Sequence, residues 1–418
     1  MLGGVSRRTL LLVGVAVALL LVGVVFGPAP ARSPNATDTA TSTDDVRLVT
    51  VNDSEARLWP YTSRQRDVET RTLPINVVVT TDLSTTRRVL AADEDRTWTT
   101  DDPEGEAVVL EGSGVAWSET TGADRYTYVE TDEGGRWIDE TAQIHDGTYL
   151  GSRYHIRLYE VSDGPDTYTA LQAHTEHWDW FRLRHTVGST ASARYVVEHE
   201  FYGTGTVADV SRERFGNGGA LDADGWVTVF DLVDYSFHDD AVYSGVLVML
   251  LAVAGGRSLV ASARDTVDAV RRSRLGPVHA ALFGTLFVVP IAVRITAVSL
   301  ERALPGLSPK VIAAPLYLVL AVGLPVAAAL LGRRLAADDA FATAAVGLGL
   351  GLLADYTYLG ITTLPVGVVF HRLVLLVGIG LLAAGGVRWA ATPLQRHRYR
   401  LAGVVVWVAA LVWPLAGL

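Results

Sequence analysis

Six apolar runs between residues 241 and 418 constrain the fold of this 418-residue chain more than any other feature. A helix needs roughly 20 mostly apolar residues to cross the hydrocarbon core of a bilayer, and most of these runs are close to that length. A seventh run, Thr9–Gly27, lies near the N-terminus. The sequence therefore predicts an α-helical transmembrane bundle with about seven spans in all. The six C-terminal runs are Ala241–Gly256, Pro277–Leu300, Val311–Gly332, Phe341–Leu359, Val366–Val387 and Leu401–Leu418.

The charge of the chain is divided between two regions. Residues 28–240 carry 39 Asp and Glu against 18 Arg, whereas the remainder has a net charge of +11. An acidic polar segment between apolar ones indicates two solvents, water and lipid. We therefore divide the chain into an N-terminal segment (1–31), a polar linker (32–45), an acidic soluble domain (46–240) and a six-span bundle (241–418).

Two interpretations of the N-terminal segment stay open. Ser6-Arg7-Arg8-Thr9 resembles a twin-arginine export signal, with Ala29-Pro30-Ala31 as a cleavage site. The apolar run is instead long enough to be an uncleaved anchor, since it exceeds the usual length of a signal core. Both interpretations place the following segment outside the membrane.

The positions of the arginines predict the orientation of the bundle. With Arg7 and Arg8 inside, the loops 257–276, 333–340 and 388–400 are also inside, and these loops are rich in arginine. Cytoplasmic loops of membrane proteins carry such an excess of positive charge. The pattern predicts a multi-pass protein of the cell membrane with a cytoplasmic N-terminus, and with the 46–240 domain and the C-terminus outside.

The soluble domain mixes strand and helix patterns without a regular alternation, which predicts the α+β class. Ser189–Tyr202 has an apolar helical face, and Asp82 or Ser84 is positioned to cap a helix that ends near Ala92. Val207–Phe215 is predicted as a further helix. β-branched and aromatic runs predict strands at Val46–Val51, Leu73–Thr80, Ala107–Leu110, Arg125–Glu130, Tyr154–Val161, Tyr168–Ala173 and Trp226–Leu232.

The composition restricts the chemistry and the partners. The chain has no cysteine, which excludes disulfides, thiolate nucleophiles and cysteine metal ligands. Phosphate binding needs a basic face, so the acidity of the domain argues against nucleic acid as a partner. The sequence does not indicate a cofactor. We expect the lipid bilayer as one partner, and an envelope protein or a small-molecule ligand as another.

The stretch from Gly147 to His185 holds the densest group of chemically active side chains. In a strand, Arg153–Tyr159 would alternate, with His155 and Arg157 on a polar face that could bind an anion or line a cleft. Farther along, imidazole and carboxylate side chains would suit zinc or a similar ion. This metal set is His174, His177 and Asp179, and His185 completes the candidates for catalysis. However, a strand and turn over this segment would place His174 and His177 on opposite faces, and a structural role is the simpler interpretation.

Arg294, Asp355, His371 and Arg372 fall inside the apolar runs, where charge is costly unless it is paired. The predicted topology places them at a similar depth, just beneath the soluble domain. We therefore expect a pair between Asp355 and either Arg294 or Arg372, with His371 beside them. The Gly347-Leu-Gly349-Leu-Gly351 pattern indicates close helix packing.

Two segments resemble a known domain. Leu73-Pro-Ile-Asn-Val-Val-Val-Thr with the helix after it, and Arg153-Tyr-His-Ile-Arg-Leu-Tyr, are similar to the LssY C-terminal-like domain over about 90 residues. Tyr159 stands where that family favours Trp. The whole chain looks like multi-span membrane proteins of halophilic archaea, in which acidic surfaces and arginine in place of lysine are typical. The resemblance implies an extracytoplasmic α+β domain and no specific activity.

These observations lead to one function hypothesis and one alternative. The first is a ligand- or partner-binding domain that a helical bundle anchors. The alternative is an envelope enzyme, such as a metal-assisted hydrolase, or a transporter. Catalysis would need the candidate side chains to meet around an accessible cavity.

Overall fold

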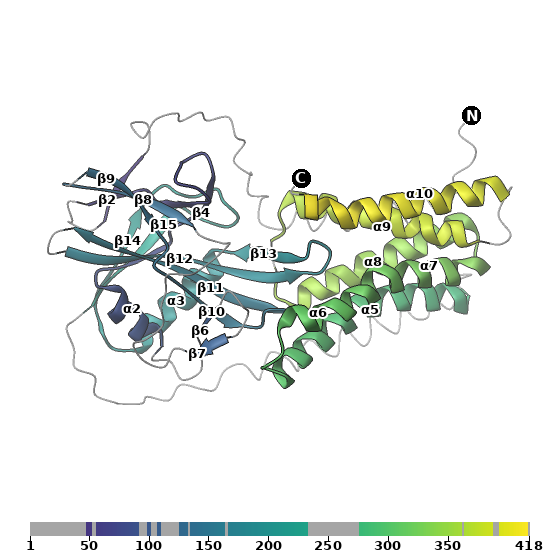
Figure 1. Ribbon diagram of the computed structural model, residues 1–418, viewed down its shortest axis with the longest axis horizontal. Coiled ribbons are helices and arrows are strands. Elements are labelled where there is room, and N and C mark those ends of the chain that lie inside the picture. The colour runs from purple at the N-terminus through teal and green to yellow at the C-terminus, as the bar shows by residue number, and fades with distance from the viewer. Residues whose placement is uncertain are drawn as a thin grey trace, which may run out of the picture.

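The molecule has a β-rich domain at one end and a bundle of long helices at the other (Figure 1). The predicted N-terminal run, the polar linker and the run Ala241–Gly256 lie outside the described residues. The computed structural model describes residues 47–51, 56–91, 98–101, 107–109, 125–132, 134–163, 166–232, 276–361, 363–387 and 393–416.

The larger sheet of the domain runs the length of the β-rich part. In the described chain it has the order β14-β15-β5-β12-β11-β10-β6-β7, with β13 also paired to β12. All pairs are antiparallel except β5 with β15. The strands are β5 (Val77–Val79), β6 (Thr99–Asp101), β7 (Ala107–Val109), β10 (Ala142–Gly147), β11 (Ser152–Asp163), β12 (Asp166–Asp179), β13 (Arg184–Ser189), β14 (Val207–Arg214) and β15 (Trp226–Leu232).

The smaller sheet has the order β1-β2-β8-β3-β4, with β9 on β8. The predicted strand Leu73–Thr80 is divided between the two sheets, because the chain crosses over at Ile75 and Asn76. The Asn76 side chain bonds both the carbonyl and the amide of Ala173, which fixes the crossover to β12. The strands are β1 (Val49–Thr50), β2 (Arg57–Leu58), β3 (Tyr61–Ser63), β4 (Arg71–Pro74), β8 (Tyr126–Thr131) and β9 (Gly134–Asp139).

Two described helices belong to the domain. Asp82 caps α2 (Leu83–Leu90) by accepting a hydrogen bond from the backbone of Thr85, as predicted. The second predicted helix is also confirmed, as α3 (Ala191–Gly203). The predicted helix at Val207–Phe215 is wrong, because this segment forms the strand β14. Its seven-residue antiparallel register with β15 outweighs its weak helical pattern.

The two faces of the larger sheet have different cores. One face packs under the two helices through residues such as Val77, Leu171, Val197 and Phe201. Toward the smaller sheet, the opposite face carries apolar residues at the far ends of β11 and β12, including Tyr159 and Tyr168. Nearer the helical bundle, that same face becomes polar. The polar part is therefore buried in a position where sheets usually place apolar side chains.

The bundle contains four described helices that are long and apolar enough to cross a membrane, which fits a multi-pass membrane protein. Four of the predicted spans match these helices. The predicted total of about seven is not tested, because part of the chain lies outside the described residues. The fifth helix, α10, packs along α9 and is less apolar. The elements are α5 (Pro277–Ala303), α6 (Pro309–Leu318), η2 (Val319–Gly323), α7 (Leu324–Leu331), η3 (Gly332–Arg334), α8 (Ala337–Tyr358), α9 (Val366–Gly386), α10 (Pro393–Val412) and η4 (Trp413–Ala416).

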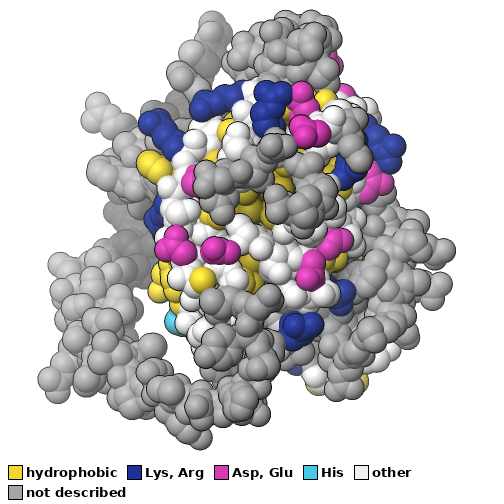
Figure 2. Space-filling model, turned by 90° about the vertical axis from the view of Figure 1, so that its left-hand side faces the viewer, with side chains coloured by type: hydrophobic (Ala, Val, Ile, Leu, Met, Phe, Trp, Pro, Cys, Tyr) yellow, Lys and Arg dark blue, Asp and Glu magenta, His cyan; other side chains and the backbone are white. Residues whose placement is uncertain are grey.

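The domain and the bundle share one hydrophobic core at their junction. The turn after β12 brings Trp180 and Phe181 into a cluster with helix residues that include Leu286 and Leu352. Figure 1 shows β11, β12 and β13 reaching the ends of the helices. On the opposite end of the domain, described acidic and basic side chains surround hydrophobic ones (Figure 2). The apolar end of the domain is thus the end that the helices cover.

Close packing between α5 and α8 depends on glycine, as the sequence predicted. A Cβ at Gly351 would lie 2.7 Å from the carbonyl oxygen of Phe287, and one at Gly347 would lie 3.0 Å from that of Phe283. The first distance is too short for a side chain and the second is tighter than most Cβ contacts, so small residues let the two backbones approach.

We expect Gly351→Ala to lower the stability of the bundle even though alanine favours helices by about 1 kcal/mol over glycine. The added methyl group would push α8 away from α5. Gly284→Ala is the matched control, because a Cβ there meets no atom within 4 Å. Thermal unfolding of the full chain in detergent measures both variants, and equal midpoints would contradict the packing argument.

Candidate functional site

Three histidines lie side by side across the central strands of the larger sheet. His145 of β10 is the register partner of His155 of β11, and His155 is the partner of His174 of β12. Their ring centroids are 4.1 and 4.7 Å apart along this row. Directly opposed side chains on one face of a sheet are close neighbours, so the register alone forces the three rings together.

Glu176 lies on the same face as this row, two residues after His174. One of its oxygens, Oε1, accepts a hydrogen bond from Nε of Arg153 at 2.7 Å. The other, Oε2, lies 3.7 Å from Nδ1 of His155 and 3.5 Å from Nε2 of His174. We call His145, His155, His174 and Glu176 the histidine row. Among the described residues, His145, His155 and Glu176 are the group whose ligand atoms all lie within 4.8 Å of one another.

The histidine row is buried, and burial decides its charge. Each of the three imidazoles is less than 5% exposed. Burial lowers the pKa of His145, His155 and His174, and positive neighbours such as Arg157 add to this effect. Burial alone would raise the pKa of Glu176, but interactions with the surrounding histidines, which include His185, His155 and His174, hold it well below its usual value. The row therefore combines neutral imidazoles with a carboxylate.

The other site residues predicted from the sequence lie either beside the histidine row or on the opposite face of the larger sheet. Arg157 forms a buried ion pair with Glu140. The ring of His185 donates a hydrogen bond to the carbonyl oxygen of Tyr149 at 2.9 Å. The segment containing His174 and His177 is a strand and turn, so these two side chains point to opposite faces. The metal set predicted from the sequence is therefore divided: His174 lies on one face of β12, and His177 and Asp179 lie on the other.

His177 and Asp179 instead face the helices. Burial lowers the pKa of His177 to about 4, although Asp179 opposes this effect, and both ring nitrogens lack a hydrogen-bond partner. The His177 ring lies 6.1 Å from that of Tyr356 on α8. Asp179 forms an ion pair through Oδ1 with Nη2 of Arg372 on α9. The end of β12 therefore contacts two membrane helices through polar groups.

A second ion pair lies beside the first. Nε and Nη2 of Arg294 on α5 bond the two carboxylate oxygens of Asp355 on α8 at 2.9 and 3.0 Å. This is one of the two pairs that the sequence predicted. Nη1 of Arg294 donates to the carbonyl oxygen of Leu150, which lies in the turn between β10 and β11. Arg294 is 1% exposed and thus ties a domain turn to the bundle interior.

Further contacts complete this junction. Nε of Arg372 donates to the hydroxyl of Tyr356 at 2.7 Å, and its Nη1 lies 2.9 Å from Nδ1 of His371. Glu301, at the end of α5, accepts hydrogen bonds from the backbone amides of Tyr149 and Leu150. We call the ion pairs Asp179–Arg372 and Arg294–Asp355, with these hydrogen bonds, the dock.

A small pocket lies within the dock and has room for about one water molecule. The residues that line it include Asp179, Trp180, Arg294, Asp355 and Arg372. A cavity of this size holds no substrate larger than water. The dock is therefore built as a contact between two parts of the chain.

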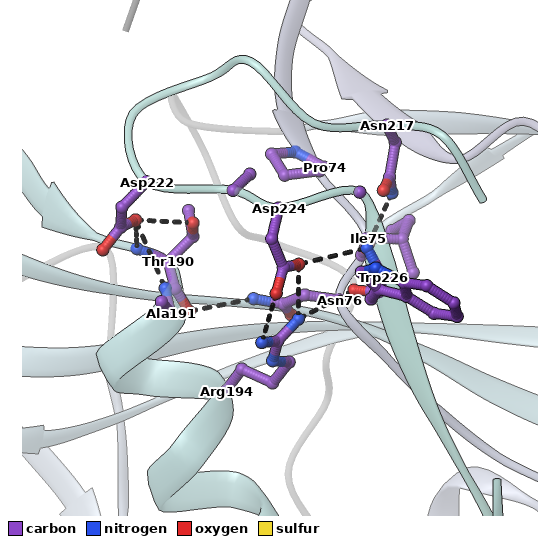
Figure 3. A pocket seen from close by; sticks show the side chains of 12 residues that line it. Pro74, Ile75, Asn76, Thr190, Ala191, Arg194, Asn217, Asp222, Asp224 and Trp226 are labelled. Atoms are coloured by element: carbon purple, nitrogen blue, oxygen red, sulfur yellow. Dashed lines mark hydrogen bonds and ion pairs between the residues drawn. The ribbon is translucent and has the colours of Figure 1, made fainter. Parts of the chain in front are cut away.

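A second pocket lies in the domain, at the start of α3 (Figure 3). Asp222 accepts hydrogen bonds from the backbone amides of Thr190 and Ala191 at 2.7 and 3.3 Å. Asp224 pairs with Arg194 through both carboxylate oxygens. Figure 3 shows these side chains bonded to one another and to backbone groups, so the pocket has a structural role.

Two members of the histidine row were missed by sequence reasoning. His145 lies just before the stretch that begins at Gly147, and Glu176 is not among the candidates predicted from the sequence. The alternation of β11 gave the correct face for His155, but it carries no information on the strand that lies beside it. Only the pairing of β10 with β11 brings His145 to the row.

Comparisons with protein-family models, curated proteins and solved structures found no match. The resemblance of Leu73–Thr80 and Arg153–Tyr159 to the LssY C-terminal-like domain therefore stays a prediction.

We expect Asp222→Asn to lower the free energy of unfolding by about 1–3 kcal/mol at neutral pH, because an amide nitrogen cannot accept the hydrogen bonds of the carboxylate. Burial raises the pKa of Asp222, but these bonds outweigh burial and lower it. The contribution of Asp222 is therefore present above the unfolded pKa of about 3.9 and is lost as the pH falls through the lower folded pKa.

Thermal unfolding of wild type and Asp222→Asn as a function of pH measures this contribution. The difference should shrink below about pH 4, where Asp222 of the wild type becomes protonated. Asp132→Asn, at an exposed position, is the control and should change little. A difference that persists unchanged in acid would show that the carboxylate charge is not the cause.

Proposed function

We propose that this protein is a membrane receptor-like protein, in which the β-rich domain binds a ligand outside the membrane and the bundle anchors the domain and responds to it. The dock is the observation that supports this proposal. A single apolar helix is sufficient to anchor a domain, whereas here buried charges and aromatic side chains of the domain enter the bundle. Through such a contact, a change in the domain on ligand binding could be passed to the helices of the bundle.

The energetics of the dock favour a fixed relation between domain and bundle. Removal of one partner of a buried ion pair costs about 3–5 kcal/mol, because the other charge stays buried without compensation. Asp179 and Arg372 come from the two different parts, so each part satisfies a charge of the other. Cation–π contacts add to this attraction, since the guanidinium of Arg294 lies 5.7 Å from the Trp180 ring.

The strands provide the connection from a binding site to the dock. β11 and β12 carry three of the four members of the histidine row, and β12 then reaches Asp179 three residues after Glu176. The turn before β11 contains Leu150, the acceptor for Arg294. A ligand that shifts these strands at the row therefore acts on both ion pairs.

The alternative functions receive less support from the described residues. An enzyme needs an accessible cavity beside its reactive groups, but the histidine row is buried and the dock pocket is small. A transporter needs polar groups along the bundle. The buried ionisable side chains of the described bundle helices, Arg294, Asp355, His371 and Arg372, all lie at the dock end.

The outside location of the domain is part of the proposal. The described helices place the domain at one end of the bundle, while Arg333 and Arg334 follow α7 at the opposite end. Arginine-rich ends favour the cytoplasm, which leaves the domain outside.

We expect Arg372→Ala to loosen the domain from the bundle, because Asp179 then lies buried without a counter-charge. The chain has no cysteine, so spin labels can be placed at Tyr195→Cys in the domain and Arg334→Cys in the bundle without further changes. Both positions are exposed. Pulsed electron paramagnetic resonance should give one narrow distance distribution in the wild type and a broad one in Arg372→Ala.

Arg302→Ala is the matched control, since Arg302 is an exposed arginine near the same end of the bundle. It should keep the narrow distribution. The double variant Asp179→Asn with Arg372→Gln removes both charges and should be narrower than Arg372→Ala. A narrow distribution in Arg372→Ala would show that the ion pair does not couple the two parts, and would remove the basis of the proposal.

A further inference from the structure

The histidine row is a group of polar side chains buried against a sheet, and burying such groups costs free energy unless they are satisfied. Sheets bury polar groups in this setting only when hydrogen bonds or a bound ion satisfy them. Nδ1 of His155 is buried and has no hydrogen-bond partner, although a carboxylate oxygen of Glu176 lies nearby.

The hydrogen bond on the other side of the ring explains this unpaired atom. Nε2 of His155 lies 3.1 Å from Oε1 of Gln143, an acceptor, so Nε2 carries the proton. In a neutral imidazole, Nδ1 then has a lone pair and no hydrogen. Two acceptor atoms, Nδ1 of His155 and Oε2 of Glu176, consequently face each other at 3.7 Å. This arrangement is unfavourable unless a cation lies between them.

The surroundings of Glu176 favour the same geometry. Arg153 donates to Oε1 and leaves Oε2 directed toward the imidazoles. Nδ1 of His174 accepts a hydrogen bond from Gln172, so the proton of His174 lies on Nε2, which is 3.5 Å from Oε2 of Glu176. Outer partners of this kind orient the ligands of metal ions in proteins.

We propose that His145, His155 and Glu176 bind a divalent first-row transition metal ion, with His174, Arg153 and Gln143 as positioning residues. This inference names the ligand of the domain and rests on the binding role proposed above. Metal–ligand bonds of about 2.0–2.2 Å place neighbouring ligand atoms about 3.3 Å apart in a tetrahedral site. The three ligand atoms lie within 4.8 Å, so small rotations of the side chains close the site.

The chemistry of the ligands selects the class of ion. Two imidazoles and one carboxylate suit zinc, iron, cobalt or manganese, whereas calcium and magnesium prefer oxygen ligands alone. The positive charge of Arg153 is close to the site and lowers the affinity for a cation. Three protein ligands leave a further coordination position for water.

A proton shared between His155 and Glu176 would satisfy the same two acceptors without a metal. The two possibilities differ in what they require. A proton needs only His155 and Glu176, whereas a metal ion also needs His145, which lies on the separate strand β10. Substitution of His145 therefore separates the two.

The test uses the full chain in detergent, freed of metal with a chelator, loaded with Zn²⁺ and desalted. Mass spectrometry should find about one zinc ion per chain in the wild type and less than about a tenth of that in His145→Ala, His155→Ala and Glu176→Gln. Loading with Co²⁺ should give the visible absorption bands of a nitrogen-ligated ion in the wild type alone. Circular dichroism verifies that each variant is folded, and Glu176→Gln keeps the shape of the side chain.

Two variants serve as controls and should retain the ion. His199→Ala removes an exposed histidine from α3, and His177→Ala removes the buried histidine on the other face of β12. The proposal is overturned if the wild type holds no zinc, or if folded His145→Ala holds as much as the wild type. The spin-label test compares Arg372→Ala with the wild type and needs no added metal, so a coupled domain without zinc would leave the proposed function standing and remove only this inference.

Discussion

Pairing of buried charge across the junction of domain and bundle is the constraint on which the rest of the structure depends. A carboxylate at the end of β12 and a guanidinium on α9 would each be costly where they lie, and each satisfies the other. Arg294 repeats the principle, since it neutralises Asp355 and also binds a domain carbonyl. These contacts fix the turn between β10 and β11, the end of β12 and three helix ends in one arrangement.

The long strands β11 and β12 connect the ion pairs of the dock to the rest of the domain. β11 and β12 pair over twelve positions, and such a ladder is stiff along its length. One face of β12 contributes to the histidine row and the other to the dock. A small shift of the strands at the row would therefore move Asp179 relative to Arg372, which is the physical basis of the response that we propose.

The histidine row has features that favour binding over catalysis. Its imidazoles are buried, and Gln143, Gln172 and Arg153 hold the surrounding atoms in place through hydrogen bonds. Preorganisation of this kind lowers the cost of binding an ion. Catalysis needs in addition a space for substrate beside the reactive atoms, and the described pockets lie elsewhere, at the dock and at the start of α3.

The sequence by itself determined the four described spans, the cap of α2 and the face of β11 that carries His155, because these depend on composition or on local periodicity. It also indicated that Arg294 and Asp355 lie at a similar depth in the membrane, because each is near the same end of its predicted span. Only the tertiary structure decided that His145 joins the row and that Asp179 enters the bundle. Strand neighbours and interface partners are set by contacts between distant segments, and no local pattern encodes them.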